Sequence, residues 1–150
     1  MSNLSASQRA AVLGAIDPDA YAASTVTTGW IDMQDWYTIM AVLMVGDFAA
    51  TSTLNAKFQQ ASDNAGTGAK DVAGAAITAL TQAGADDNKQ AVINLQQGDL
   101  DFNNGFRFVR LSATIATAAA DFGAVVVGLS PRFGAADAGD AATVDEIVTA

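Results

Sequence analysis

Short apolar segments with period-two alternation, separated by turn-forming residues, limit this chain to a small set of folds. Between residues 24 and 133, clusters of Gly, Asn and Asp recur at short intervals, and the chain contains 2 prolines. Segments of this kind are typical of antiparallel strands, and no long amphipathic helical pattern accompanies them. We therefore predict about seven or eight short strands in an all-β antiparallel β-sandwich or jelly-roll-like fold.

Individual segments make this prediction more specific. Leu54–Phe58 alternates cleanly and should point Leu54, Ala56 and Phe58 inward. Tyr37–Val45 is apolar on both alternating faces, which predicts a strand buried on both sides. In the segment from Phe106 to Ile115 the apolar positions change parity, which predicts a β-bulge near Phe108–Val109. The other strands are expected at 25–31, 90–95 and 124–129, and residues 76–81 should form a short strand or one helical turn.

The two ends of the chain differ in composition from its centre. Ser5 and Gln8 have capping-box spacing, which predicts a short helix over Ala6–Ala15 that ends at Asp17-Pro18. The segment from Gly134 onward is rich in Ala, Gly and Asp, which favours an extended tail. The predicted organisation is an N-terminal arm (1–22), a β-sandwich domain (23–133) and a C-terminal tail (134–150). We expect both ends to become ordered on neighbouring molecules.

Composition and charge exclude several classes of function. Hydrophobic residues make up 51% of the chain and charged residues 15%, against a usual charged fraction of about 25%. A surface with so little charge indicates coverage by copies of the same chain or by a larger assembly. The net charge of −9 argues against nucleic-acid binding, which needs a basic surface.

The chain contains no Cys and no His, which removes disulfides, thiol nucleophiles, Cys/His metal sites and His-based triads. The N-terminus has no apolar signal region, and the longest apolar run, Ile39–Val45, is shorter than the roughly 20 residues of a membrane helix. We therefore expect a protein made in the cytoplasm that has no membrane partner.

Four acidic or glycine-rich segments are candidates for sites of chemistry. Asp99-Leu-Asp101-Phe-Asn103 resembles the start of a calcium loop, but Asn104 and Arg110 occupy positions where that loop needs Gly and Glu, so an Asn-Gly turn fits better. The glycines at 66 and 68 lack the spacing of a phosphate-binding loop. The acidic pairs lie in turn-like, solvated segments, at Asp32/Asp35 and Asp86/Asp87. The sequence therefore predicts no enzyme, no metal and no cofactor.

Two groups of side chains are candidates for partner or subunit contact. The aromatic group surrounds one turn and consists of Trp30, Trp36 and Tyr37. Aromatic residues at strand ends commonly close a sandwich core, and they can also stack on a sugar. The cationic group consists of Arg107, Arg110 and Arg132, which can pair with Asp within the chain or across a subunit interface. The predicted bulge would bring Arg107 and Arg110 to one face.

Several segments together resemble a group of small structural proteins of tailed bacteriophages. They are Gly66–Asp71, Asp87–Gln90, Phe106–Leu111, Gly123–Gly128 and Pro131–Gly134, and the resemblance covers roughly residues 25–135. It implies a virion protein made in the cytoplasm of a bacterial host, which decorates the capsid without enzymatic activity. Its expected partners are the major capsid protein and copies of itself, in trimers or similar clusters.

Two other functions remain open at this point. The protein could be a tail, neck or fibre-associated component of the virion. It could also be a β-sandwich carbohydrate-binding module that uses Trp30, Trp36 and Tyr37 as stacking platforms and a loop calcium at Asp99/Asp101.

Overall fold

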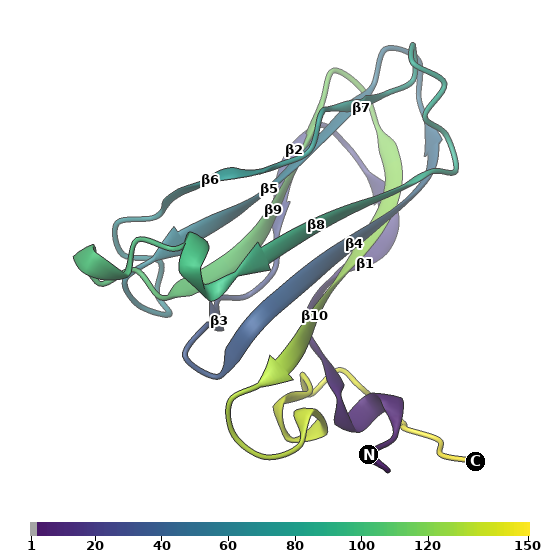
Figure 1. Cartoon of the computed structure of the whole chain (residues 1–150). Coiled ribbons are helices and arrows are strands. Elements are labelled where there is room, and N and C mark those ends of the chain that lie inside the picture. Colours follow the sequence, from purple (N-terminus) through teal and green to yellow (C-terminus); the bar gives the residue numbers. More distant parts are fainter. Residues whose placement is uncertain (1–2) are drawn as a thin grey trace.

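The computed structural model describes residues 3–150 and consists of two antiparallel sheets (Figure 1). Sheet A contains, in spatial order, β1 (Ala10–Tyr21), β10 (Ala120–Pro131), β4 (Trp36–Phe48) and β8 (Gln90–Gln96). Sheet B contains β2 (Ser24–Thr27), β9 (Phe108–Ala116), β5 (Thr53–Ala61) and β6 (Lys70–Ala76). Two short strands extend sheet B, with β3 (Ile31–Asp32) on β9 and β7 (Leu80–Thr81) on β5. The short 3₁₀ turns are η1 (Ala6–Gln8), η2 (Gln97–Asp99), η3 (Phe102–Asn104) and η4 (Ala136–Gly139).

The connections between strands identify the sandwich as a jelly roll. The first strand pairs with the last, and most connections cross from one sheet to the other, so that sequence neighbours lie in opposite layers. This arrangement confirms the predicted fold class. Both termini lie at the same end of the sandwich, beyond the C-terminal end of β10 (Figure 1).

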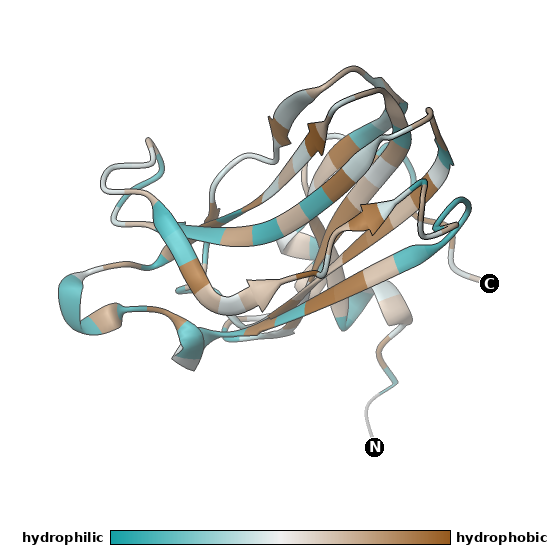
Figure 2. Cartoon of the chain, turned by 90° about the horizontal axis from the view of Figure 1, so that it is seen from above, coloured by the Kyte–Doolittle hydropathy of each residue, from teal (hydrophilic) through white to brown (hydrophobic). Residues whose placement is uncertain are grey.

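The core lies between the sheets and follows the alternation of the strands. Leu54, Ala56 and Phe58 on β5 are buried, as their spacing predicts. Polar and apolar bands alternate along several strands, which is visible in Figure 2. Because successive side chains point to opposite faces, each strand contributes every second residue to the core. The largest fully buried side chains are Phe58, Met33, Ile39, Leu43, Leu54, Leu95, Leu111, Ile115, Val109 and Val126.

Three strand predictions are corrected by the structure. The strand expected at 76–81 does not form, because β6 (Lys70–Ala76) ends where it should begin and only Leu80–Thr81 pairs, as β7. β4 is buried on one face only, because Leu43 and Val45 are buried while Met44 between them is exposed. β9 has no bulge near Phe108–Val109, because its register with β5 is continuous from Ala61↔Phe108 onward. The apparent change of parity arises because Phe106 precedes the strand and Phe108, the first residue of β9, occupies an outward, half-buried position.

The predicted helix over Ala6–Ala15 is wrong. Ser5 and Gln8 do form a cap, in which the Ser5 backbone N–H donates to Gln8 Oε1 at 3.0 Å, but the turn ends at Gln8. Residues 10–21, placed in an arm by the sequence analysis, form β1 and pair with β10. Asp17-Pro18 lies in a bulge of this edge strand. Proline is tolerated there because an edge strand has no neighbour on one side, so a missing backbone N–H on that side breaks no hydrogen bond of the sheet.

The start of the C-terminal tail packs on the sandwich. Ala136 is fully buried, and the tail hydrogen-bonds to the free edge of β1. The Val12 N–H donates to Asp140 Oδ1 at 2.7 Å, and the Ala141 N–H donates to the Val12 carbonyl at 2.7 Å. These two bonds satisfy backbone groups of an edge strand that would otherwise be open to pairing. Among residues 3–150, no helix has the length and apolar character needed to cross a membrane.

Candidate interaction surface

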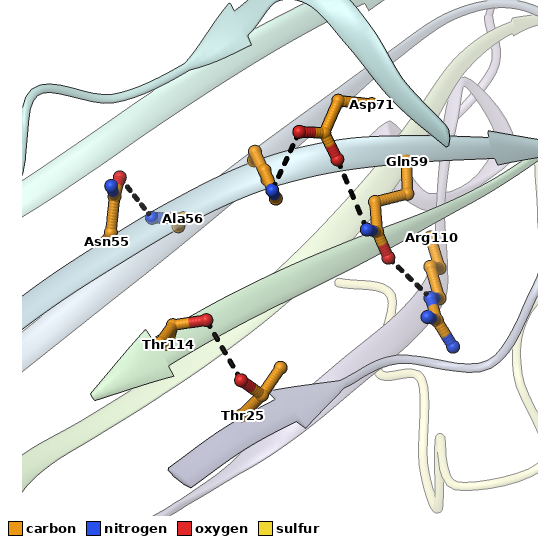
Figure 3. Close-up of polar contacts among 8 residues, drawn as sticks. Thr25, Asn55, Ala56, Gln59, Asp71, Arg110 and Thr114 are labelled. Atoms are coloured by element: carbon orange, nitrogen blue, oxygen red, sulfur yellow. Dashed lines mark hydrogen bonds and ion pairs between the residues drawn. The ribbon is translucent and has the colours of Figure 1, made fainter. Parts of the chain in front are cut away.

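The outer face of sheet B is polar and internally hydrogen-bonded (Figure 3). Thr25 and Thr114 share a hydrogen bond of 3.0 Å between neighbouring strands. Asp71 accepts from Gln59, whose side-chain carbonyl in turn accepts from Arg110 Nε at 3.0 Å. A face with paired polar groups is the usual condition of a sheet surface exposed to water.

The outer face of sheet A is different, because apolar residues form continuous rows across its strands. One row joins Ala15, Val125, Val42 and Val92 through the registers of β1, β10, β4 and β8. Val92 and Met44 on this face are 51% and 61% exposed. Next along the strands, a second row joins Val12, Val127 and Met40. Two opposed faces of one sandwich therefore differ sharply in their chemistry.

The apolar outer face of sheet A has a signal in the sequence, but that signal is ambiguous. Apolar residues at both parities of Tyr37–Val45 were interpreted as burial on two sides. The same pattern arises when one side faces the core and the other faces a partner. The pattern alone does not distinguish the two cases, because both remove the side chains from water in the assembled state.

A groove of about 650 Å³ lies at one end of this apolar face. Val42, Met44 and Val125 contribute its apolar lining. Pro18 packs directly against Gly123 on the outer side of the sheet. A Cβ at Gly123 would lie 2.9 Å from Pro18 Cα, so only glycine permits this approach. The bulged part of β1 thereby forms one wall of the groove.

Three carboxylates, Asp17, Asp19 and Asp121, also line the groove. No Lys or Arg side chain within residues 3–150 forms an ion pair with any of them. Asp19 Oδ1 accepts the N–H of the next residue, Ala20. The Tyr21 hydroxyl donates to the Asp17 carbonyl at 2.7 Å. Partial burial, followed by the nearby charges of Asp17 and Asp19, raises the pKa of Tyr21.

The three predicted aromatic residues do not form one exposed platform. Trp36 is buried in the core and packs close to Gly128 and Gly139. Trp30 is half-buried, with the Arg110 guanidinium 4.6 Å from its ring centroid. Tyr37 is 52% exposed. The sequence identified core closure for Trp36, but the stacking of Trp30 depends on a strand that is distant in sequence.

The three predicted cationic residues have separate local environments. Arg107 forms an ion pair with Asp32 at 2.9 Å, next to the β3–β9 pairing. Arg110 lies on the outer face of sheet B, with Gln59. Arg132 stacks over the ring of Tyr37 with a centroid distance of 5.2 Å. The regular β9 strand therefore does not bring Arg107 and Arg110 together through a bulge.

The acidic turn residues considered for chemistry act as hydrogen-bond acceptors. Asp101 accepts from Lys70 Nζ at 2.6 Å and from Asn104, which lower its pKa. Asp86 accepts from the Thr81 N–H and from Lys89, and its pKa is lowered too. Gly105 has a φ of +82°, as expected for the Asn-Gly turn. Within the described part of the chain, no group of three or more acidic side chains is arranged to hold a metal ion.

No protein-family model and no curated protein matches the chain. Among solved structures, a chain of infectious bursal disease virus (Gx strain) is 13% identical over 85% of this chain, with a TM-score of 0.49. This chain spans 33% of the length of that viral chain. A chain of broad bean stain virus is 10% identical, with coverage of 90% and 93% and a TM-score of 0.46.

The CBM22-2 xylan-binding domain from Paenibacillus barcinonensis Xyn10C is 12% identical, with coverage of 75% and 88% and a TM-score of 0.37. All three TM-scores are below 0.5. The fold assignment therefore rests on the strand order and registers of this chain.

Proposed function

We propose that this protein is a non-enzymatic structural protein of a bacteriophage virion. In this proposal it is a decoration protein that binds the mature head lattice in many copies and stabilises it. The single observation that carries the proposal is the apolar row on the outer face of sheet A that crosses all four strands, formed by Ala15, Val125, Val42 and Val92. The sequence resemblance to small phage structural proteins supports the placement in a virion.

The physical argument starts from the contrast between the two outer faces. Sheet B satisfies its outer polar groups within the chain, so it is suited to contact with water. Sheet A instead exposes valine and methionine rows, whose contact with water is unfavourable. Covering these rows against a neighbouring protein would release that water and would favour association.

Three acidic side chains outside the groove support an adhesive role over a chemical one. Asp71, Asp86 and Asp101 are surface acceptors for lysine and backbone groups. Decoration of a lattice needs no reacting group. Many weak contacts, repeated over a shell, add up through multivalency and resist rupture of the shell.

The partners in this proposal are the major capsid protein and copies of this chain. A tail, neck or fibre-associated position uses the same kind of surface, but it differs in copy number. Hundreds of copies per particle correspond to decoration of the head. Roughly six or twelve copies correspond to a closed ring in the neck or tail.

The experiment is co-sedimentation of the purified protein with purified expanded capsids of a tailed phage that encodes it. Light scattering first gives the mass of the free protein, so that bound copies can be counted. Saturable binding of hundreds of copies to expanded capsids, without binding to unexpanded ones, is the expected result. Recovery of all protein in the supernatant, or incorporation into tails alone, would overturn the head placement.

A further inference from the structure

We propose that the groove at the end of the sheet A face docks an extended polypeptide segment that carries aliphatic side chains flanked by Lys or Arg. This inference deepens the proposed function and rests on it for the source of the segment, which would be a protein of the shell. The chemistry of the segment is inferred from the groove alone.

The apolar lining defines the central part of the ligand. Val42, Met44 and Val125 present aliphatic and thioether surface on adjacent strands, and Pro18 closes one side. A volume of about 650 Å³ is in the range of pockets that accept several side-chain-sized groups. Gly46 and Gly123 also line the groove, and the space that a Cβ would fill at each is taken by Asp121 and Pro18, which form part of the groove wall.

The charges around the lining define the flanks of the ligand. Asp17, Asp19 and Asp121 place three negative charges at the groove, and none of them has a cationic partner within residues 3–150. A segment with Lys or Arg beside its apolar residues would complement these charges. An acidic or neutral segment would leave them uncompensated.

The same charges argue against a second copy of this chain as the occupant. Each molecule carries a net charge of −9, and two such grooves placed against each other would bring like charges together. Charge complementarity therefore favours a basic partner.

The first experiment tests the groove without capsids, by NMR of methionine methyl groups. The chain contains 4 methionines, and Met44 lines the groove while Met33 is fully buried in the core. The probes are the peptide acetyl-Gly-Lys-Leu-Val-Lys-Gly-amide and its counterpart with both lysines replaced by glutamate. The lysine peptide is expected to shift the Met44 signal saturably and to leave Met33 unchanged. The glutamate peptide is expected to leave both signals unchanged.

Two matched variants test the charges. Asp17→Asn/Asp121→Asn removes two charges at the groove and preserves the Tyr21 bond, which uses the Asp17 backbone carbonyl. Asp35→Asn/Asp99→Asn removes two charges outside the groove. The groove variant would lose two surface ion pairs with the lysine peptide, which should weaken its affinity for that peptide about fivefold. The expected loss occurs in the groove variant alone.

Three results would overturn the inference. They are equal effects of the two peptides, equal affinity of the two variants, or a Met44 shift that depends on protein concentration without peptide. The last result would identify a second copy as the occupant. Conversely, a shift produced by the lysine peptide alone supports the inference.

Expanded capsids separate this inference from the proposed function. If wild-type protein binds capsids and the groove variant binds equally well, the inference fails and the proposed function stands. If the lysine peptide occupies the groove but wild-type protein does not bind capsids, the proposed function fails and the groove specificity stands.

Discussion

At the scale of single residues, Tyr21 reports on the charges around the groove. Partial burial raises its pKa above the ordinary value of 10.0, and the charges of Asp17 and Asp19 raise it further. We predict that Asp17→Asn lowers the Tyr21 pKa but leaves it above 10.0, because the burial against Phe122 remains. An NMR pH titration of the ring signals measures this shift. The Asp35→Asn variant should leave the titration unchanged, and an equal shift there would contradict the assignment.

The hydroxyl of Thr28, the residue after β2, forms a hydrogen bond to the backbone of β9. Thr28 is buried, and its Oγ1 accepts the Leu111 N–H at 3.0 Å where β2 has ended. Thr28→Val keeps the shape and leaves a buried N–H without an acceptor, so we predict a loss of about 1–3 kcal/mol in the free energy of unfolding. The exposed Thr25→Val variant should change it by no more than about 0.5 kcal/mol. Urea denaturation compares the two, and equal losses would contradict the explanation.

Residue-level prediction from sequence succeeded where a contact follows from strand alternation. Leu54, Ala56 and Phe58 are buried because their spacing matches the pleat of β5. The stacking of Arg110 on Trp30 was not predicted, because it joins residues that meet only through tertiary pairing. The carboxylates of the groove were missed because Asp17 and Asp121 come from strands that are distant in sequence.

At the scale of elements, the C-terminal tail provides a test of how β1 is held. Residues 135–141 cover Trp36 and hydrogen-bond to Val12, whereas Ile147 and Val148 in the segment 142–150 are exposed. We predict that deleting 135–150 lowers the free energy of unfolding by about 2–3 kcal/mol. Deleting only 142–150 should change it by less than about 0.5 kcal/mol. Thermal and urea unfolding measure both, and a large loss from the shorter deletion would contradict this division of the tail.

β1 shows why a strand can be mistaken for a helix. Its alanines and the Ser5–Gln8 cap favour a helix locally, yet pairing with the valine-rich β10 determines the structure. The proline that was expected to end a helix is instead accommodated in a bulge. Tertiary pairing of this kind is not encoded in local spacing, which is why the N-terminal boundary of the sandwich was placed too late.

At the scale of the whole molecule, stability should depend on pH through the carboxylates that are held by lysine and backbone donors. Hydrogen bonds from Lys57 and Lys70 lower the pKa values of Asp71 and Asp101 below 3.8. A lowered pKa in the folded state means that the stabilisation is present above pH 3.8 and is lost as the pH falls through the lowered values.

We therefore predict a constant contribution from these groups between pH 7 and about pH 5, and a falling urea midpoint below about pH 4. The double variant Asp71→Asn/Asp101→Asn should show a weaker dependence in the acid range. Urea denaturation at pH 7, 5 and 3 checks this. A double variant with the same acid dependence as wild type would contradict the assignment.

The jelly-roll class itself was predictable from the sequence, because short alternating strands with frequent turns allow few architectures. The use of the two outer faces was not predictable to the same degree. Residues at one parity of β4 and β10 face the core and are apolar, and most of those at the other parity, such as Met40, Val42, Val125 and Val127, are apolar as well. Only the strand order reveals that the second set forms a single surface.

The most direct test of the proposed role of that surface is a count of copies bound per expanded capsid for two lysine variants. Val42→Lys introduces a charge in the apolar rows of sheet A, and Thr114→Lys introduces the same charge on the polar face of sheet B. Both variants should fold, since both positions point away from the core. If sheet A binds the capsid, we predict that Val42→Lys weakens capsid binding by about tenfold or more and that Thr114→Lys binds like wild type. Undiminished binding of Val42→Lys, or loss of binding by Thr114→Lys alone, would contradict this prediction.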